Sequence, residues 1–451
     1  MNSAKGAKRR KFRTSALAAT CLATAFSAPV IAQEESILGG ETIRIIGIGD
    51  PVFQAMQKFH GEMEEMTGGT IQLDVRPFDV LRQQVLLNAQ NSTSSYDIIA
   101  VDLPQFGEYK PFLTDLDGFI DATGYDGSDF HDVAWSGAQF GGAQLGIPLQ
   151  PHPEIFAYRT DIFEKYGLDA PTTHEKVLAA ARTISEQEDG MSGVCWNAAR
   201  GTALGQTFIM DMGDFGAAPI DMVKEGDDYL MGDIQPANMK PMIDTEAGKA
   251  TADYLQALME VSPPGILNMA WDERVRVYGQ GGCAMTYIWA GRSAIFEQDE
   301  ASPARGNTAY LPHPSGPDSP PKSTLGGWYL AIPNNIDPDR AELAWKTIEW
   351  LASPEMIEEY TKYGNCVSPR SSVSKIDSVI ERCPVIPHVE DMSIKGELAG
   401  WQRPPVPEVQ IIVDVLGAEM HQVISGEKPS EEALSDAQSQ LDREMRKAGY
   451  Y

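Results

Sequence analysis

The chain has 451 residues, a formal net charge of −28 and a hydrophobic fraction of 42 %. This length is sufficient for two or three domains. The acidic balance argues against nucleic acid and anionic lipid as partners, because both carry the same sign of charge. We therefore expect no nucleic-acid partner, and we attribute the charge to solubility outside the cytoplasm.

The N-terminus has the three parts of a secretory signal peptide. A basic segment ending at Arg13 precedes a short apolar stretch from Ala16 to Ala28, and Val30 to Ala32 has the small-residue form of a cleavage site. The apolar stretch is too short to span a membrane. We expect residues 1–32 to be removed, which changes the formal charge from −28 to −34, because this segment carries six basic residues and no acid.

The same segment bears on the export route and on anchoring. Arg9 to Phe12 partly resembles a twin-arginine signal, but Arg13 and Thr14 depart from that pattern, which favours the general export route. A lipoprotein anchor at Cys21 fits poorly, because more apolar residues follow it. No later segment is long and apolar enough to cross a bilayer, so we expect a soluble, exported chain.

Four cysteines remain after the leader, and an oxidising compartment permits three ways of pairing them. They are Cys195, Cys283, Cys366 and Cys383, and none has the C-x-x-C spacing of a zinc or redox site. Cys195 and Cys283 each lie in an apolar, strand-like stretch and could be neighbours in one sheet. A disulfide between them and two buried free thiols are both open.

The N-terminal region predicts a parallel α/β sheet. Strands and helices alternate in the order strand Thr42–Ile48, helix Val52–Thr67, strand Ile71–Val75, helix Asp79–Gln90 and strand Tyr96–Val101. This order corresponds to two successive βαβ units. Such sheets bind ligands at the carboxyl ends of their strands, which points to the loops that begin at Gly49-Asp50 and at Asp102.

The rest of the chain continues the α/β pattern. Residues 146–159 are expected to form a proline-punctuated loop that enters a strand, and residues 302–324 a loop region rich in Pro, Ser and Gly. The elements expected between them are helix Asp161–Tyr166, a helix from a Thr172–Glu175 capping box through Thr183, strand Met191–Asn197, a helix that begins at Gly201, helices Thr245–Met259 and Trp271–Gln280, and strand Cys283–Trp289. A strand with Trp328, a helix with Trp345 and a helix capped by Ser353 follow.

Six segments resemble, in the same order, segments of bacterial family 1 extracellular solute-binding proteins. They are residues 97–119 (DIIAVDLPQFGEYKPFLTDLDGF), 157–181 (AYRTDIFEKYGLDAPTTHEKVLAAA), 245–258 (TEAGKATADYLQAL), 271–291 (WDERVRVYGQGGCAMTYIWAG), 325–355 (LGGWYLAIPNNIDPDRAELAWKTIEWLASPE) and 425–445 (SGEKPSEEALSDAQSQLDREM). Each segment alone is weak evidence of the resemblance, but the ordered set covers nearly all of the mature chain. The chain departs from the family pattern at Arg159, where asparagine is usual, and at His174, where tryptophan is usual.

The resemblance implies an α/β, two-lobed periplasmic-binding-protein fold of type II, a "flytrap" in which the chain crosses between the lobes three times. Lobe 1 would hold residues 33–147 and 307–362, and lobe 2 residues 148–306 and 363–451. Such a protein is periplasmic, binds a small carbohydrate in the interlobe cleft, closes by hinge motion and docks on ABC permease subunits in the inner membrane. The implied protein is a monomer that is not an enzyme and holds no cofactor or metal.

A sugar or polyol site needs aromatic faces for C–H surfaces and planar polar groups for hydroxyls. Candidates were chosen at strand ends, on the loop before Tyr158 and at the lobe crossings, and each has an ordinary structural role as its alternative. Trp289 and Trp328 could be core, Asp50 a helix cap, Gly326 and Gly327 a bulge, and Arg370 an interlobe salt bridge. The candidate ligand-binding residues are Asp50, Gln54, Asp102, Gln150, His152, Glu154, Arg200, Trp289, Gly327, Trp328 and Arg370.

Within the family, the polyol-type members are the most similar in character. The shared features are the run from Tyr158 to Asp161, the cysteines at 195 and 283, and the ending EMRKAGYY. The loop after Val101-Asp102 lacks the tryptophan that maltose-type relatives have near there, which favours a small sugar or polyol over a long oligosaccharide.

Two other classes of protein are alternatives. A secreted carbohydrate-active hydrolase is the main alternative, although the chain contains no H-E-x-x-H, G-x-S-x-G or P-loop motif. A metal-binding transport component would require clustered ligand residues, and the seven histidines are scattered along the sequence.

Overall fold

The structure, a computed structural model, describes residues 36–232 and 234–451, and residues 36–451 form one compact unit. The expected signal peptide, residues 1–32, lies outside the described residues. Of the helices in the described part of the chain, none is long and apolar enough to cross a membrane.

A nine-stranded sheet in the described residues has the order β2-β1-β3-β12-β6-β10-β7, with β11 paired to β6 and β13 paired to β12. β1 pairs in parallel with both β2 and β3, as the βαβ pattern predicts, whereas β12 joins β3 antiparallel. The strands are β1 (Thr42–Ile48), β2 (Thr70–Arg76), β3 (Ile98–Asp102), β4 (Gln139–Phe140), β5 (Ala143–Gln144), β6 (Ile147–Arg159), β7 (Ser192–Cys195), β8 (Lys224–Glu225), β9 (Asp228–Tyr229), β10 (Cys283–Trp289), β11 (Thr308–Leu311), β12 (Ser323–Ala331) and β13 (Leu398–Ala399).

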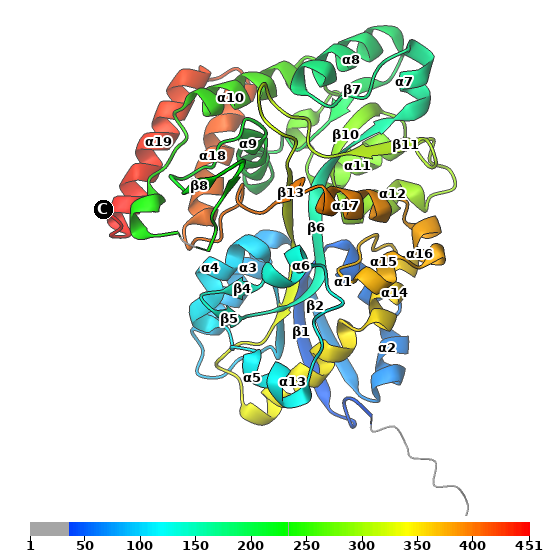
Figure 1. Cartoon of the computed structure of the whole chain (residues 1–451), viewed down its shortest axis with the longest axis vertical. Helices are drawn as coiled ribbons and strands as arrows, with labels where there is room; N and C mark the ends of the chain where they lie inside the picture. Colours follow the sequence, from blue (N-terminus) through cyan, green and yellow to red (C-terminus); the bar gives the residue numbers. More distant parts are fainter. Residues whose placement is uncertain (1–35, 233) are drawn as a thin grey trace, which may run out of the picture. The chain divides into compact units, whose positions relative to one another are not determined.

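Helices surround this sheet (Figure 1). The α-helices are α1 (Pro51–Lys58), α2 (His60–Thr67), α3 (Phe78–Ala89), α4 (Phe106–Tyr109), α5 (Asp117–Thr123), α6 (Asp132–Ser136), α7 (Thr160–Tyr166), α8 (His174–Gln187), α9 (Thr202–Asp214), α10 (Glu246–Met259), α11 (Trp271–Gly279), α12 (Ala294–Glu297), α13 (Pro338–Leu351), α14 (Pro354–Lys362), α15 (Ser371–Ser374), α16 (Asp377–Arg382), α17 (Val385–Ile394), α18 (Val409–Ile424) and α19 (Ser430–Lys447). Short 3₁₀ segments are η1 (Leu103–Gln105), η2 (Lys110–Phe112), η3 (Pro236–Met239), η4 (Ile266–Asn268) and η5 (Ala290–Ser293).

The long strand β6 links the two halves of the sheet (Figure 1). Its first part pairs with β12, and its second part, from Glu154 onward, pairs with β10 and β11. Of the loop entering a strand that is expected over residues 146–159, the strand is confirmed and the loop is wrong, because β6 spans Ile147–Arg159. Pro148, Pro151 and Pro153 are each aligned with a residue of β12. Proline lacks an N–H but its fixed φ is compatible with an extended strand.

Three further expectations on local structure need correction. The helix predicted over Val52–Thr67 is broken at Phe59, whose ψ of 28° ends α1 and whose ring stacks on Tyr363 with centroids 4.6 Å apart. The capping residue of α8 is Thr173, which accepts a hydrogen bond from the Lys176 N–H, and not Thr172. The region 302–324 contains the short strand β11, which is too brief to give a pattern.

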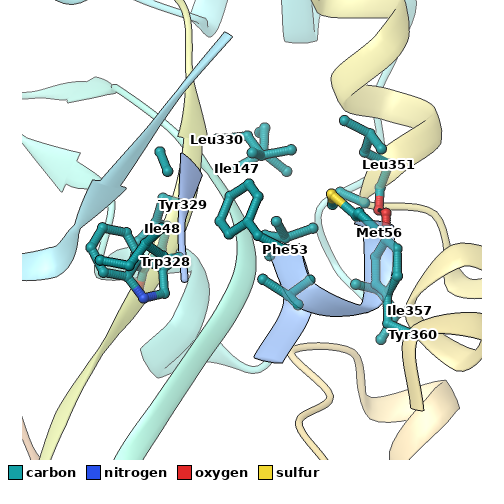
Figure 2. Packing of buried hydrophobic residues seen from close by; sticks show 14 of the residues in the cluster. Ile48, Phe53, Met56, Ile147, Trp328, Tyr329, Leu330, Leu351, Ile357 and Tyr360 are labelled. Atoms are coloured by element: carbon teal, nitrogen blue, oxygen red, sulfur yellow. Dashed lines mark hydrogen bonds between the residues drawn. The ribbon is translucent and has the colours of Figure 1, made fainter. Parts of the chain in front are cut away.

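Two buried hydrophobic clusters lie within the described residues. One gathers the residues of β1, β3 and β12 with helices α1, α13 and α14. The second gathers β7 and β10 with α9, α18 and α19. Figure 2 shows part of the first, where Met56 of α1 lies beside Ile357 and Tyr360 of α14, and Phe53 lies on the side of Ile147. Gly47 makes room for this packing, since a Cβ there would lie 2.4 Å from the Phe53 ring.

Disulfides join all four cysteines of the described chain. Cys195 pairs with Cys283 and ties β7 to β10, two adjacent parallel strands. Cys366 pairs with Cys383, at a sequence separation of 17, and closes a segment that contains α15 and α16. The first bridge closes 88 residues, so it constrains the unfolded chain more strongly than the second.

Candidate ligand-binding site

A pocket of about 330 Å³ lies at the carboxyl ends of β1 and β3, where a sheet of this kind is expected to bind ligands. Its volume lies near the lower end of the range for small-molecule sites. The lining residues come from many separate parts of the chain: Ile48, Gly49, Asp50, Pro77, Phe78, Asp79, Asp102, His152, Thr202, Gln206, Trp271, Asp272, Glu273, Trp289, Arg292, Gly327, Trp328 and Arg403.

One polar group of the pocket is built around Asp50. It follows β1 at the N-cap position of α1, but its side chain makes no capping hydrogen bond. Oδ1 instead accepts from Arg292 at 2.5 Å, and Oδ2 accepts from the Trp328 indole N–H at 2.6 Å. Arg292 Nε also donates to Asp272 at 2.8 Å. This chain of charge-assisted bonds fixes the orientation of the Trp328 ring and of the guanidinium.

A second polar group is built around Asp102, at the end of β3. Its carboxylate forms an ion pair with Arg403 and accepts the Gly327 N–H at 3.1 Å. Gly327 has a φ of 108°, and a Cβ there would lie 2.0 Å from the Gln150 carbonyl oxygen. Only glycine therefore allows β12 to approach both Asp102 and β6 so closely. The side chains of Asp102, Arg403 and the neighbouring Trp289 are buried.

The Trp289 indole lies close to the guanidinium of Arg403 and to the imidazole of His152. The Arg403 guanidinium carbon lies 5.4 Å from its ring centre, and the His152 ring centre lies 5.2 Å away. A side chain at Gly326 would collide with both Trp289 and Arg403, because its Cβ would come within 2.8 Å of each. The indole is thus held in place at the end of β10, where it lines the pocket.

His152 lines the pocket as a neutral imidazole. Burial, with Arg292 and Arg403 nearby, lowers the pKa of His152 well below its usual range, so the ring is neutral. Nδ1 accepts from the Gly291 N–H at 3.1 Å. The neutral ring therefore carries its proton on Nε2, which lies 3.4 Å from the amide nitrogen of Gln150.

The mouth of the pocket is closed on one side by α3 and α9. Thr202, the first residue of α9, donates to Asp79 of α3 at 3.2 Å. Phe78 sits edge-on to Trp328, with ring centres 6.1 Å apart. Gln206, one turn further along α9, lines the pocket from the same side.

Six of the residues expected from the sequence line this pocket, and five do not. The six are Asp50, Asp102, His152, Trp289, Gly327 and Trp328. Gln54 donates to the Gly49 carbonyl and Gln150 accepts the Val52 N–H, so both support the loop that carries Asp50. Arg200 is exposed. Glu154 and Arg370 are buried elsewhere.

Arg370 has a structural role at the segment that follows α14. It donates to the Ala352 carbonyl at 2.6 Å and to the Tyr125 hydroxyl at 2.9 Å, and it lies 3.4 Å from Asp129. Its guanidinium carbon lies 3.9 Å from the centre of the Phe130 ring. This residue is fully engaged with protein groups.

The sequence reasoning missed several lining residues, above all the two arginines. Arg292 comes three residues after the strand-end Trp289, and that spacing is a signal that could have been used. Arg403 lies between β13 and α18 in a stretch without regular structure, where no pattern marks it. The other polar and aromatic residues overlooked are Phe78, Asp79, Thr202, Gln206, Trp271, Asp272 and Glu273.

A second, fully buried charged cluster lies apart from the pocket. Glu154 of β6 forms an ion pair with Arg274 of α11 and lies 3.5 Å from His313. His313 Nδ1 is 3.2 Å from Asp214 of α9, and Asp211 is on the same helix. Burial opposes the charged form of His313, but Asp214 and Glu154 outweigh it and raise its pKa to about 10. Burial raises the pKa of Asp211 well above its usual range.

The comparisons with known proteins agree with this architecture. The model of the bacterial extracellular solute-binding protein family matches residues 50–358. The chain therefore belongs to this family, and its fold is the type II periplasmic-binding-protein fold. Among solved structures, a solute-binding protein of Agrobacterium radiobacter K84 in complex with ribitol matches with a TM-score of 0.81 and 25 % identity, over 90 % of this chain and 99 % of that one.

Two curated relatives have almost the same length. A probable amino-acid ABC transporter periplasmic-binding protein of Sinorhizobium fredii is 25 % identical over 98 % of this chain and 99 % of that protein. A mannitol-binding protein of Pseudomonas aeruginosa is 23 % identical over 96 % of this chain and 98 % of that protein. The relatives thus differ in the solute that their names give.

Proposed function

We propose that this chain is the periplasmic solute-binding component of an ABC importer and that its solute is a small, uncharged polyol or sugar. The observation that carries this proposal is the pair of Asp–Arg groups in the pocket. Asp50 with Arg292, and Asp102 with Arg403, place ionic hydrogen-bonding groups beside aromatic surfaces. Such planar groups bind vicinal hydroxyls, and Trp289 and Trp328 can cover C–H faces.

The charge of the pocket favours an uncharged solute over one that carries a carboxylate, such as a sugar acid or the zwitterion of an amino acid. Both lining arginines, Arg292 and Arg403, already neutralise aspartates, and the acids that line the pocket outnumber them. A ligand carboxylate would have to displace one of these buried pairs and leave an aspartate unpaired, which is costly. Hydroxyl groups of a solute can form hydrogen bonds with the same carboxylates and guanidinium groups without breaking the ion pairs.

The names of the relatives support the polyol reading. Besides the mannitol-binding relative and the ribitol complex, an erythritol/L-threitol-binding protein of Mycolicibacterium smegmatis is 22 % identical over 77 % of this chain and 74 % of that protein. The amino-acid name of the Sinorhizobium relative is the competing indication. The charge pattern of the lining residues supports the polyol.

The remaining parts of the proposal follow from the class. We infer that the chain is exported by its N-terminal segment, works as a monomer with permease subunits in the inner membrane, and releases its ligand unchanged. The lobe boundaries expected from the resemblance, 33–147 with 307–362 and 148–306 with 363–451, belong to the same proposal. Family membership supports binding over the alternative of a carbohydrate-active hydrolase.

A thermal-shift screen of the protein tests this function. The set would contain ribitol, mannitol, erythritol, several monosaccharides, sugar acids and amino acids. A ligand at a hundredfold excess over its Kd should add about 2.7 kcal/mol of stability, which is a shift of several degrees. We expect shifts for polyols or sugars and none for amino acids. A shift with an amino acid alone would overturn the assignment, and conversion of a bound sugar to products would establish the hydrolase instead.

A further inference from the structure

The buried charged cluster on α9 has the geometry of a ligand set. One ligand atom from each of Asp211, Asp214 and His313 lies within 4.8 Å of the others, and all three residues are buried. Asp211 and Asp214 are three residues apart on α9, and Thr207 is four residues before Asp211, so the three lie on one face of the helix. His313 reaches this face from the segment after β11.

Asp211 lacks the partners that a buried carboxylate requires. Neither of its oxygens has a hydrogen-bond partner among the described residues, although the residue is 0 % exposed. Among the described residues, the basic atom within reach of Asp211 is His313 Nδ1, which lies 4.0 Å from Asp211 Oδ1. The Thr207 hydroxyl on the same helix face is likewise buried and without a hydrogen-bond partner among the described residues. A carboxylate in this position needs a proton or a cation.

The charges of the cluster leave room for one divalent cation. Glu154, Asp211 and Asp214 are acidic, whereas Arg274 is the permanent cation beside them. With both aspartates ionised and His313 neutral, these residues would carry two net negative charges. A divalent ion would therefore take the place of two protons, one on His313 and one on Asp211, and leave the net charge of the cluster unchanged.

The spacing also suits a metal bound by nitrogen and oxygen. His313 Nδ1 and Asp214 Oδ1 form a hydrogen bond of 3.2 Å, and His174 Nε2 lies 3.1 Å from Asp214 Oδ2. The distance of 3.2 Å is also close to the edge of about 3.3 Å of a tetrahedron with bonds of about 2.0 Å. On the other side of the ring, His313 Nε2 faces Glu154 Oε2 at 3.5 Å. A carboxylate behind a histidine is the usual support of a metal-binding imidazole, because it orients the ring and raises its basicity.

We propose that Asp211, Asp214 and His313 bind a structural divalent transition-metal ion, best matched by Zn²⁺, with the Thr207 hydroxyl as a neutral fourth ligand. An imidazole with two carboxylates favours such an ion over Ca²⁺ or Mg²⁺, which take oxygen ligands. The ion would tie α9 to the segment after β11. None of its four ligands lines the solute pocket, so this site is independent of the proposed solute.

A metal-content measurement on the full chain, prepared without a histidine tag, tests the site. The protein is stripped with EDTA, incubated with Zn²⁺ or Mn²⁺, freed of excess ion by gel filtration and analysed by mass spectrometry. The wild type should retain about one equivalent and gain roughly 3 °C or more in Tm over the stripped protein. Retention of neither ion, with no gain in Tm, would overturn the proposal.

Asp211→Asn separates loss of the site from loss of the fold. Because Asp211 makes no hydrogen bond with the described residues, the stripped variant should be at least as stable as the stripped wild type, yet it should retain no ion and show no metal-induced shift. Asp253→Asn is the matched control, since Asp253 is exposed on α10, and it should behave as the wild type. Equal retention by Asp211→Asn and the wild type would place the ion elsewhere and refute the assignment.

Discussion

Arg403 and Asp102 form a buried ion pair in the pocket although 301 residues separate them in the sequence. Asp102 ends β3, and Arg403 lies in the segment before α18. The pair therefore joins two distant parts of the chain at the ligand pocket, next to Trp289. Its integrity should matter both for the fold and for binding.

Arg403→Lys tests this pair. Lysine retains the charge but cannot reproduce the fork of guanidinium donors, so we expect polyol affinity to fall at least tenfold while the fold persists. Arg403→Ala leaves Asp102 buried and unpaired and should destabilise the protein by roughly 3–5 kcal/mol. Titration calorimetry and urea unfolding provide the two readouts. Arg446→Ala, which removes an exposed pair with Asp442 on α19, is the control and should change neither.

Gly327→Ala tests the close approach of β12 to β6. The residue has a φ of 108° and its Cβ would lie 2.0 Å from the Gln150 carbonyl oxygen, so β12 would have to move away from Asp102. We expect a loss of at least about 1–3 kcal/mol in unfolding free energy, together with weaker ligand binding. Gly118→Ala on α5, where no atom lies near the new methyl group, should be neutral or slightly stabilising. Equal effects of the two substitutions would contradict this account.

Trp289→Ala tests the aromatic contribution to the pocket. The indole lies beside His152 and Arg403 at the end of β10, so its removal should weaken binding at least tenfold while secondary structure is retained. Trp350→Ala on α13 removes a partly buried indole of the hydrophobic core and should leave affinity unchanged. Unchanged affinity in Trp289→Ala, measured by calorimetry, would remove this residue from the site.

Asp97 is expected to make the free energy of unfolding depend on pH. Burial opposes its charge, but hydrogen bonds from Arg44 and Arg340 prevail and lower the pKa of Asp97 in the folded state. A lowered folded pKa means that the contribution is complete above the unfolded pKa of about 3.9 and is lost as the pH falls through the folded pKa. Asp97→Asn should therefore be less stable than the wild type at pH 7. The difference, followed by urea unfolding, should shrink below about pH 4, and a difference that grows in acid would be inconsistent with this assignment.

The sequence was a good guide where the local pattern determines the structure. The strand Thr42–Ile48 is confirmed with the same bounds, because its largely apolar sequence is typical of a buried parallel strand. The capping residue of α8 was misplaced by one position, since Thr172 and Thr173 are both good caps. The sequence predicts a loop for the first part of β6 because its prolines interrupt the apolar pattern, although they align with residues of β12.

The residues of the candidate site also differ in whether a local sequence pattern marks them. The candidates Asp50, Asp102 and Trp289 lie at or beside the end of an apolar strand, and Trp328 follows a glycine pair. The fold brings all four to one pocket. Arg403 has no such marker, and its role depends on a contact between segments far apart in the chain. The cluster of Asp211 with His313 is of the same kind, because histidines scattered in the sequence carry no sign of their neighbours in space.

The most direct test of the central claim is a calorimetric titration of the protein with ribitol and mannitol, with an amino acid mixture as comparison. The account predicts saturable binding of at least one polyol at one site per chain, with a Kd of about a micromolar or tighter, which corresponds to roughly −8 kcal/mol or beyond. It also predicts no heat of binding for the amino acids. Saturable amino-acid binding, with neither polyol bound, would contradict the assignment of a neutral polyhydroxy solute to this pocket.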